Sequence, residues 1–126
     1  MEMRNPFSLA GKRALVAGAS RGIGLAIAQA TARAGAHVTL AARSLEALEA
    51  HAAALRAEGC GASALALDFT SSDSIRAAAD ACGEIEILMN VSGMNIRKAF
   101  PEYTREEYDR IFQTNLHGVF ELTQIL

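Results

Sequence analysis

Hydrophobic positions along this chain change their spacing in a repeating order, from short continuous runs to runs spaced like one face of a helix. The continuous apolar runs lie at residues 13–18, 37–42, 63–68 and 84–90. Segments with helical spacing follow these runs, beginning near residues 22, 44, 70 and 104. Strands that alternate with helices are typical of a parallel sheet covered by helices on both faces. The pattern therefore predicts an α/β fold with a doubly wound parallel sheet.

The same pattern indicates where helices begin and which faces they bury. Ser44 is placed to cap the second helix and Gly59 to end it, and residues 104–107, "TREE", form a capping box. The apolar positions of the first two helices are Ile23, Ile27, Ala30, Ala34, Leu45, Leu48, Ala52 and Leu55. In the last helix an apolar stripe is formed by Tyr108, Ile111, Phe112, Leu116, Val119 and Phe120. We expect these faces to pack on the sheet or on a partner.

Composition and charge limit the size and the partners of the protein. The 126 residues allow one domain, and 51% hydrophobic against 21% charged residues is the balance of a folded globular chain. A net charge of −2 without a basic stripe gives no sign of nucleic acid or a membrane surface as a partner. No apolar signal segment is seen, and Cys60 and Cys82 lack metal-ligand spacing. We therefore expect a cytoplasmic protein with reduced thiols and no metal site.

Three glycines follow the first apolar run at a spacing that suits a phosphate. Gly18, Gly22 and Gly24 form the pattern G-x-x-x-G-x-G between the first strand and the first helix. Glycine allows a tight turn, lets backbone N–H groups approach a pyrophosphate, and lets the helix pack closely on the strand. The alternative is that these glycines only satisfy the geometry of the turn. Their place at a strand-to-helix boundary favours a dinucleotide-binding loop.

Four motifs in order resemble those of the short-chain dehydrogenase/reductase family. They are "AGASRGIG" at 17–24, an acidic residue after the third strand at Asp68, "NVSG" at 90–93 and "NLHG" at 115–118. The segments "GKRALVAGASRGIG" and "NIRKAF" make the chain most similar to the gluconate 5-dehydrogenase group of that family. Ala17 and Val91 depart from the family pattern, which has a threonine and an asparagine there. The resemblance implies a Rossmann-type sheet in strand order 3-2-1-4.

The resemblance also implies which residues contact the cofactor. They are Gly18, Ser20, Arg21, Gly22, Ile23, Gly24, Arg43, Asp68, Phe69, Asn90, Ser92 and Gly93. Among these, Asp68 would bind the adenine amino group with help from the Phe69 backbone, while Asn90, Ser92 and Gly93 would line the ribose of the nicotinamide half. An alternative role for Asp68 is to cap the next helix.

The end of the second strand favours NADP over NAD. An NAD site places an acidic residue there to bind the ribose 2′-hydroxyl, but this chain has Ala42 at that position, followed by Arg43. A guanidinium can bind a 2′-phosphate through two hydrogen bonds, whereas a carboxylate would repel it. Arg21, within the glycine loop, is a second mark of NADP in the resembling family. The alternative for Arg43 is a solvated surface charge.

Asn115 interrupts the apolar stripe of the last helix. Its position in "NLHG" matches an asparagine that, in the resembling family, orders a water next to the catalytic lysine in a tetrad of Ser, Tyr, Lys and Asn. The resemblance therefore implies a catalytic role for Asn115. The alternative is an amide that hydrogen-bonds a neighbouring backbone group. Neither Tyr103 nor Tyr108 has a lysine four residues later, and the histidines are expected to be solvated or structural.

Together these features predict residues 1–126 as one dinucleotide-binding domain, incomplete after its fourth strand and the following helix. By resemblance, the complete protein transfers a hydride between NADP and a small carbonyl or alcohol substrate and forms a homo-oligomer. The 126 residues alone are expected to be inactive. One alternative is a noncatalytic NADP-binding module or partner subunit. Another is a methyltransferase, but Arg43 stands where that class needs an acidic residue.

Overall fold

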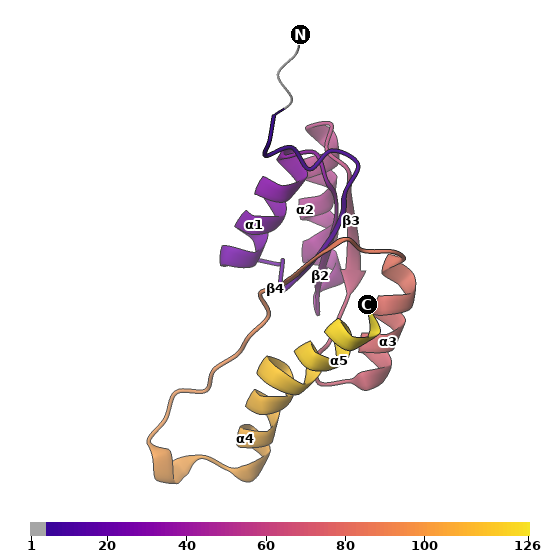
Figure 1. Cartoon of the computed structure of the whole chain (residues 1–126). Helices are drawn as coiled ribbons and strands as arrows, with labels where there is room; N and C mark the ends of the chain where they lie inside the picture. Colours follow the sequence, from indigo (N-terminus) through magenta and orange to yellow (C-terminus); the bar gives the residue numbers. More distant parts are fainter. Residues whose placement is uncertain (1–4) are drawn as a thin grey trace.

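A four-stranded parallel sheet forms the centre of the computed structural model, which describes residues 5–126 (Figure 1). Its strands are β1 (Arg13–Ala17), β2 (His37–Ala42), β3 (Ala62–Ala66) and β4 (Ile87–Asn90). They lie in the order β3-β2-β1-β4, and every neighbouring pair is parallel. The predicted fold class and strand order are therefore confirmed. The predicted domain starts at residue 1, and residues 1–4 lie outside the described part of the chain.

Helices connect the strands and follow the last one. They are α1 (Gly22–Arg33), α2 (Leu45–Ala57), α3 (Ser72–Cys82), the short 3₁₀ helix η1 (Phe100–Glu102), α4 (Arg105–Phe112), the π-helical segment η2 (Gln113–His117) and α5 (Gly118–Ile125). The Ser44 hydroxyl caps α2 and the Ser71 hydroxyl caps α3. The predicted capping box of Thr104 and Glu107 is present at the start of α4. The predicted terminal helix runs through α4, η2 and α5, and its π-helical stretch η2 was not indicated by the spacing.

Alternate side chains of the strands enter two separate hydrophobic cores, one on each face of the sheet. Val16 and Leu40 pack with α1 and α2 on one face. Leu15 and Ala41 pack with α3 and with Leu122 of α5 on the other. Figure 1 shows these helices on opposite sides of the sheet. Successive strand residues point to opposite faces, so the apolar runs serve both cores.

The buried face of α1 differs from the predicted one. Its buried residues are Gly24, Ala28, Thr31 and Ala32. Ile23, which the pattern placed inward, is 75% exposed beside the glycine loop, and Ala30 is also exposed. Small residues let the helix lie close to β1, and that close approach decides which side faces inward. On α2 the predicted face is correct apart from Leu45, which is 45% exposed.

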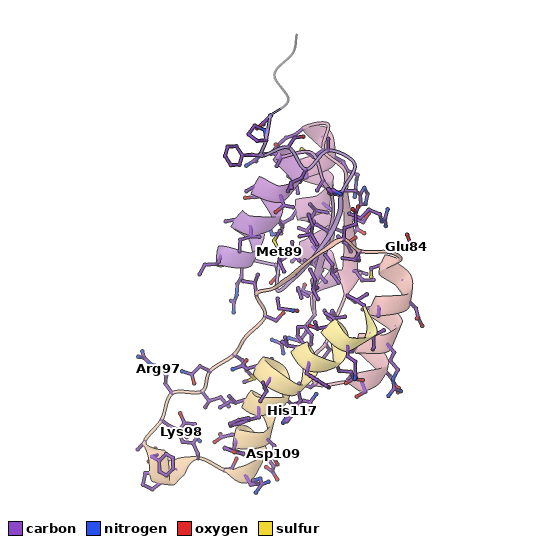
Figure 2. The ribbon with its side chains drawn as sticks, in the orientation of Figure 1. Glu84, Met89, Arg97, Lys98, Asp109 and His117 are labelled. Carbon is purple, nitrogen blue, oxygen red and sulfur yellow. The ribbon has the colours of Figure 1, made fainter. Side chains whose placement is uncertain are left out.

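After β4 the chain leaves the sheet and returns through α4. Figure 1 shows residues 91–99 running out from the sheet without regular structure, before η1 and the start of α4. Arg97, Lys98 and Asp109 lie in this projecting part, far from the strands (Figure 2). The Lys98 ammonium lies 2.8 Å from both carboxylate oxygens of Glu107, which ties the extended segment to the first turn of α4. The projecting part is thus held by polar contacts more than by a core.

Two properties of the described residues bear on partners. No helix among residues 5–126 is long and apolar enough to cross a membrane. In the same part of the chain, no three His, Cys, Asp or Glu side chains gather closely enough to hold a metal ion.

Candidate functional site

The carboxyl ends of the strands meet at one edge of the sheet. Ala17 at the end of β1 pairs with Ala41 of β2 on one side and Asn90 of β4 on the other, and Ala42 pairs with Ala66 of β3. The loops that follow these strands therefore converge. An open cavity of about 850 Å³ lies there, between the loops and the helical segment that contains Arg110. Crevices at this edge of parallel sheets are the usual place for ligands.

Most of the residues predicted from the sequence line this cavity. They are Gly18, Ser20, Arg21, Gly22, Ile23, Gly24, Arg43, Asp68, Phe69, Ser92 and Gly93. Asn90 does not line it, because its side-chain amide donates to the Thr123 hydroxyl of α5 at 3.2 Å. Asn115 does not line it either and instead binds the neighbouring loop. The sequence motifs thus converge in space, with two asparagines turned to other contacts.

The glycine loop requires glycine at two positions for reasons of space. At Gly18, φ is +94°, and an added Cβ would lie 2.6 Å from the Ser92 backbone nitrogen. At Gly24 an added Cβ would lie 1.8 Å from the Gly18 carbonyl oxygen. These contacts bring β1, the start of α1 and the loop after β4 together. Gly22 differs, because a Cβ there would meet nothing within 4 Å.

Hydrogen bonds from two directions hold this loop. The N–H groups of Gly18 and Ala19 donate to the Ala41 carbonyl at 2.8 and 3.2 Å. From α2, the His51 ring nitrogen Nε2 lies 3.0 Å from the Ser20 carbonyl oxygen. The sequence predicted that His51 is either solvated or structural, and this contact corresponds to the second alternative. Helical spacing alone could not reveal this contact, because it depends on how α2 packs beside the loop.

Arg43 and Asp68 lie on adjacent loops of the cavity. Hydrogen bonds from the Thr70 hydroxyl and the Thr70 N–H, at 2.7 and 2.9 Å, lower the pKa of Asp68, and the nearby Arg43 charge lowers it further. The carboxylate is therefore negative at neutral pH. Ser71, not Asp68, caps α3, so the alternative reading of Asp68 as a helix cap was wrong. The Arg43 side chain is exposed at the cavity and free to meet a ligand.

Asn115 lies in the π-helical segment and binds the loop after β4. Its carbonyl oxygen Oδ1 accepts from the Met94 N–H, and its Nδ2 donates to the Met94 carbonyl, both at 2.8 Å. The residue is exposed, and both of its bonds go to backbone groups, as the alternative of an amide bound to neighbouring backbone predicts. The stripe itself is open, with Leu116 55% and Phe120 63% exposed. Asn115 therefore joins the helix to the backbone beside Gly93.

The sequence did not indicate several of the lining residues, and two of these come from the last helical segment. Arg110 of α4 and Thr114 of η2 both line the cavity. They are four residues apart and so lie on one side of the helical segment, a spacing that could have indicated a shared face. The Thr114 hydroxyl oxygen is buried and has no hydrogen-bond partner. Among the described residues, no other buried side-chain nitrogen or oxygen lacks a partner. Tyr103 takes no part in the cavity, because its hydroxyl donates to the Ile96 carbonyl.

Comparison with known proteins gives a consistent set of relatives. The sequence model of the family described as short chain dehydrogenase matches residues 12–126. Gluconate 5-dehydrogenase of Gluconobacter oxydans is 41% identical over 122 residues, which are 94% of this chain and 48% of that protein. The likeness to gluconate 5-dehydrogenases predicted from the sequence is thus confirmed.

Solved structures agree with this result. A gluconate 5-dehydrogenase from Burkholderia cenocepacia, in complex with NADP and tartrate, has a TM-score of 0.86 at 34% identity, covering 94% of this chain and 48% of that one. The RhlG/NADP active-site complex of Pseudomonas aeruginosa has a TM-score of 0.90 at 38% identity, covering 98% and 50%. This chain therefore spans about half the length of the relatives that it matches.

Proposed function

Because this chain belongs to the short-chain dehydrogenase family, we propose that it binds NADP at the carboxyl edge of its sheet and serves hydride transfer. The substrate would be a small molecule with a carbonyl or alcohol group. The observation that carries the proposal is the glycine loop, in which close packing at Gly18 and Gly24 leaves the space beside Gly22 open to a ligand. Relatives named as dehydrogenases and reductases support the same class of reaction.

The residues of the cavity fit a dinucleotide. Arg21, the residue that precedes α1, has no side-chain cap for the first N–H groups of the helix, so these remain available to a pyrophosphate. The carboxylate of Asp68 can accept a hydrogen bond from an adenine amino group. Thr114 lines the same cavity, and its hydroxyl oxygen is buried without a hydrogen-bond partner. A volume of about 850 Å³ is large enough for a cofactor of this kind.

The preference for NADP over NAD follows from the charges at the end of β2. Ala42 and Arg43 both line the cavity, and so does Arg21 from the glycine loop. Two guanidinium groups on one side of the cavity can bind a 2′-phosphate by charge-assisted hydrogen bonds. The two relatives solved with NADP support this assignment by analogy.

Asn115 is proposed to act beside the reacting groups. When bound, nicotinamide supplies the hydride or accepts it. The chain's own part is to hold Ser92, Gly93 and the Met94 backbone in place for the nicotinamide half, and Asn115 fixes that loop through both of its amide atoms. By resemblance, the same residue orders a water on the path of the catalytic proton. The π-helical geometry around it is a feature frequently found at functional sites.

By resemblance, the general acid of the reaction is a tyrosine that is followed four residues later by a lysine. No such pair occurs within these 126 residues. Neither Tyr103 nor Tyr108 is followed four residues later by lysine. We therefore propose that this chain by itself binds cofactor without reducing a carbonyl. A noncatalytic NADP-binding role for the whole protein is the alternative, and turnover of carbonyl substrates by the natural protein would exclude it. Assembly into a homo-oligomer, with the exposed stripe of α4 and α5 covered, belongs to the same proposal.

Titration with NADPH and NADH tests the proposal. We expect NADPH to bind more tightly, and Arg43→Asp to lower the ratio of the two affinities by about tenfold or more, because a charge-assisted pair is lost and a repulsion is added. Arg105→Asp is the matched control, since this exposed arginine pairs with Asp109 away from the cavity and should leave the ratio unchanged. Equal or tighter binding of NADH by the natural sequence would overturn the assignment of NADP.

A further inference from the structure

His51 makes a contact that the cavity residues do not explain. It lies on α2, is half-buried, and places Nε2 3.0 Å from the carbonyl oxygen of Ser20. A carbonyl oxygen only accepts hydrogen bonds, so the ring nitrogen must carry the proton and donate it. Both the charged ring and one neutral tautomer can do this. The contact therefore does not depend on the charge of the histidine.

The group that His51 holds is the peptide between Ser20 and Arg21. Both residues line the cavity, and Arg21 immediately precedes α1. A trans peptide is planar, with its C=O and N–H pointing in opposite directions, so fixing the Ser20 oxygen toward α2 also fixes the Arg21 N–H away from it. The orientation of this peptide decides how the start of α1 meets the cavity.

Other contacts do not fix this peptide. The backbone bonds to Ala41 hold Gly18 and Ala19, which lie before it. Arg21 makes no side-chain capping bond. Among the described residues, only the His51 side chain donates a hydrogen bond to residues 18–22. An added Cβ at Gly22 would meet no atom within 4 Å, so packing does not restrain the loop on that side.

We propose that His51 is a positioning residue for nucleotide binding. Its ring holds the Ser20–Arg21 peptide in the conformation that the phosphates require before the nucleotide arrives. This lowers the entropy that the loop would otherwise lose on binding. The inference rests on the proposed function, because it names a determinant of affinity for the same site. His51 itself does not line the cavity and so does not touch the nucleotide.

The test compares three variants with the natural sequence, using NADPH fluorescence for the dissociation constant and thermal unfolding for stability. His51→Leu keeps the bulk and removes the donor, and we expect it to raise the dissociation constant roughly three- to tenfold. His51→Gln keeps a nitrogen donor at a similar reach and should recover most of the affinity. His37→Leu is the matched control, because His37 also makes one hydrogen bond, to Ser63 at 2.8 Å, near the opposite edge of the sheet. It should change stability but not affinity.

The outcomes separate this inference from the proposed function. A natural protein that binds no NADPH would overturn both. If it binds NADPH and His51→Leu binds equally well, or if Gln and Leu at position 51 lose affinity to the same extent, His51 has only a structural role and the inference fails. If His51→Leu does not fold, His51→Ala replaces it, with the same expected loss of affinity and the same recovery by glutamine.

Discussion

Residues 5–90, the packed region, and residues 91–126, the second region, are stabilised in different ways. Residues 5–90 supply all the described buried hydrophobic side chains except Leu122, and they form two cores around the sheet. Residues 91–126 instead hold most of the large exposed apolar side chains: Phe100, Tyr108, Phe112, Leu116, Phe120, Ile125 and Leu126. The position of the glycine loop is therefore set by dense packing. The segment beyond β4 depends on a small number of identifiable contacts.

The cavity is built from both regions, and this gives the difference its functional meaning. The packed region supplies the glycine loop, Arg43 and Asp68, while the other region brings Arg110 and Thr114 to the opposite wall. The second wall is attached near Phe69, whose carbonyl accepts from the Gln113 side chain at 3.0 Å. An added Cβ at Gly118 would lie 2.7 Å from that same carbonyl. Substitutions in the packed region should therefore perturb nucleotide recognition. Substitutions in residues 91–126 should instead perturb the positioning of the nicotinamide half of the cofactor.

The largest effect should come from filling the space at the glycine loop. In Gly24→Ala the new Cβ would overlap the Gly18 carbonyl, which cannot move without disturbing the bonds of the loop to Ala41. We expect the free energy of unfolding to fall by more than about 4 kcal/mol, with loss of NADPH binding. Chemical denaturation and NADPH titration measure the two effects.

Gly22→Ala is the matched control for this substitution. Here φ is +58° and no atom lies within 4 Å of the added Cβ, so the cost is the backbone strain of about 1–2 kcal/mol. Equal losses of stability in Gly24→Ala and Gly22→Ala would show that the loop can accommodate a Cβ at position 24.

The next largest effect tests the attachment of the second region. Leu122 is 0% exposed and joins α5 to the core that contains α3. Leu122→Ala should lower the free energy of unfolding by about 3 kcal/mol, measured by chemical denaturation. Gln124→Ala, at an exposed position of the same helix, should change it by less than about 0.5 kcal/mol. If both variants are equally stable, α5 does not depend on that core for its position.

Asn115 tests whether the second region carries chemistry. In the active enzyme, Asn115→Leu should lower kcat by about 100-fold or more while the NADPH dissociation constant changes by less than about threefold. Stability should fall by only about 1–2 kcal/mol, because the two bonds to Met94 are exposed to solvent. Steady-state kinetics and denaturation measure these quantities. If turnover survives the substitution, Asn115 only ties its helix to the loop.

The smallest expected effect is a loss of local stability around Glu107 at low pH. The hydrogen bond from Lys98, with a further one from the Thr104 N–H, lowers the pKa of Glu107 below its ordinary value of 4.5. A lowered folded-state pKa stabilises the folded form above pH 4.5, and this contribution is lost as pH falls through the lowered value. Hydrogen exchange in residues 98–110 should therefore accelerate below about pH 4, after correction for intrinsic rates. Lys98→Met should weaken that pH dependence, and an unchanged profile would show that the ion pair has no such role.

The packed region could be predicted from the sequence because its pattern and its packing agree. Continuous apolar runs serve two cores, and Ser44 caps its helix as the local chemistry requires. The capping box of Thr104 and Glu107, which begins α4 in the other region, could be predicted for the same local reason. Strand β4 is shorter than predicted, since it begins at Ile87 and leaves Glu84 and Glu86 exposed before it.

The remaining features depend on tertiary contacts that spacing does not encode. A π-helical segment has no hydrophobic period of its own, so η2 could not be found by counting apolar positions. The inward face of α1 is set by the close approach at Gly24, and the contact of His51 is set by the packing of α2 beside the loop. Eleven of the twelve cofactor-binding residues predicted from the sequence, Arg43 among them, line the cavity. Grouping them needs no such information, because they follow strands whose ends must converge.

A crystal structure of the protein with NADP would show whether the packed region binds the dinucleotide through its glycine loop and the end of β2. We expect the pyrophosphate to lie against the backbone N–H groups between Gly18 and Gly24. We also expect the 2′-phosphate within hydrogen-bond distance of Arg43 and Arg21, and the adenine beside Asp68. A cofactor seated elsewhere, or a 2′-phosphate in solvent with both arginines turned away, would contradict this expectation.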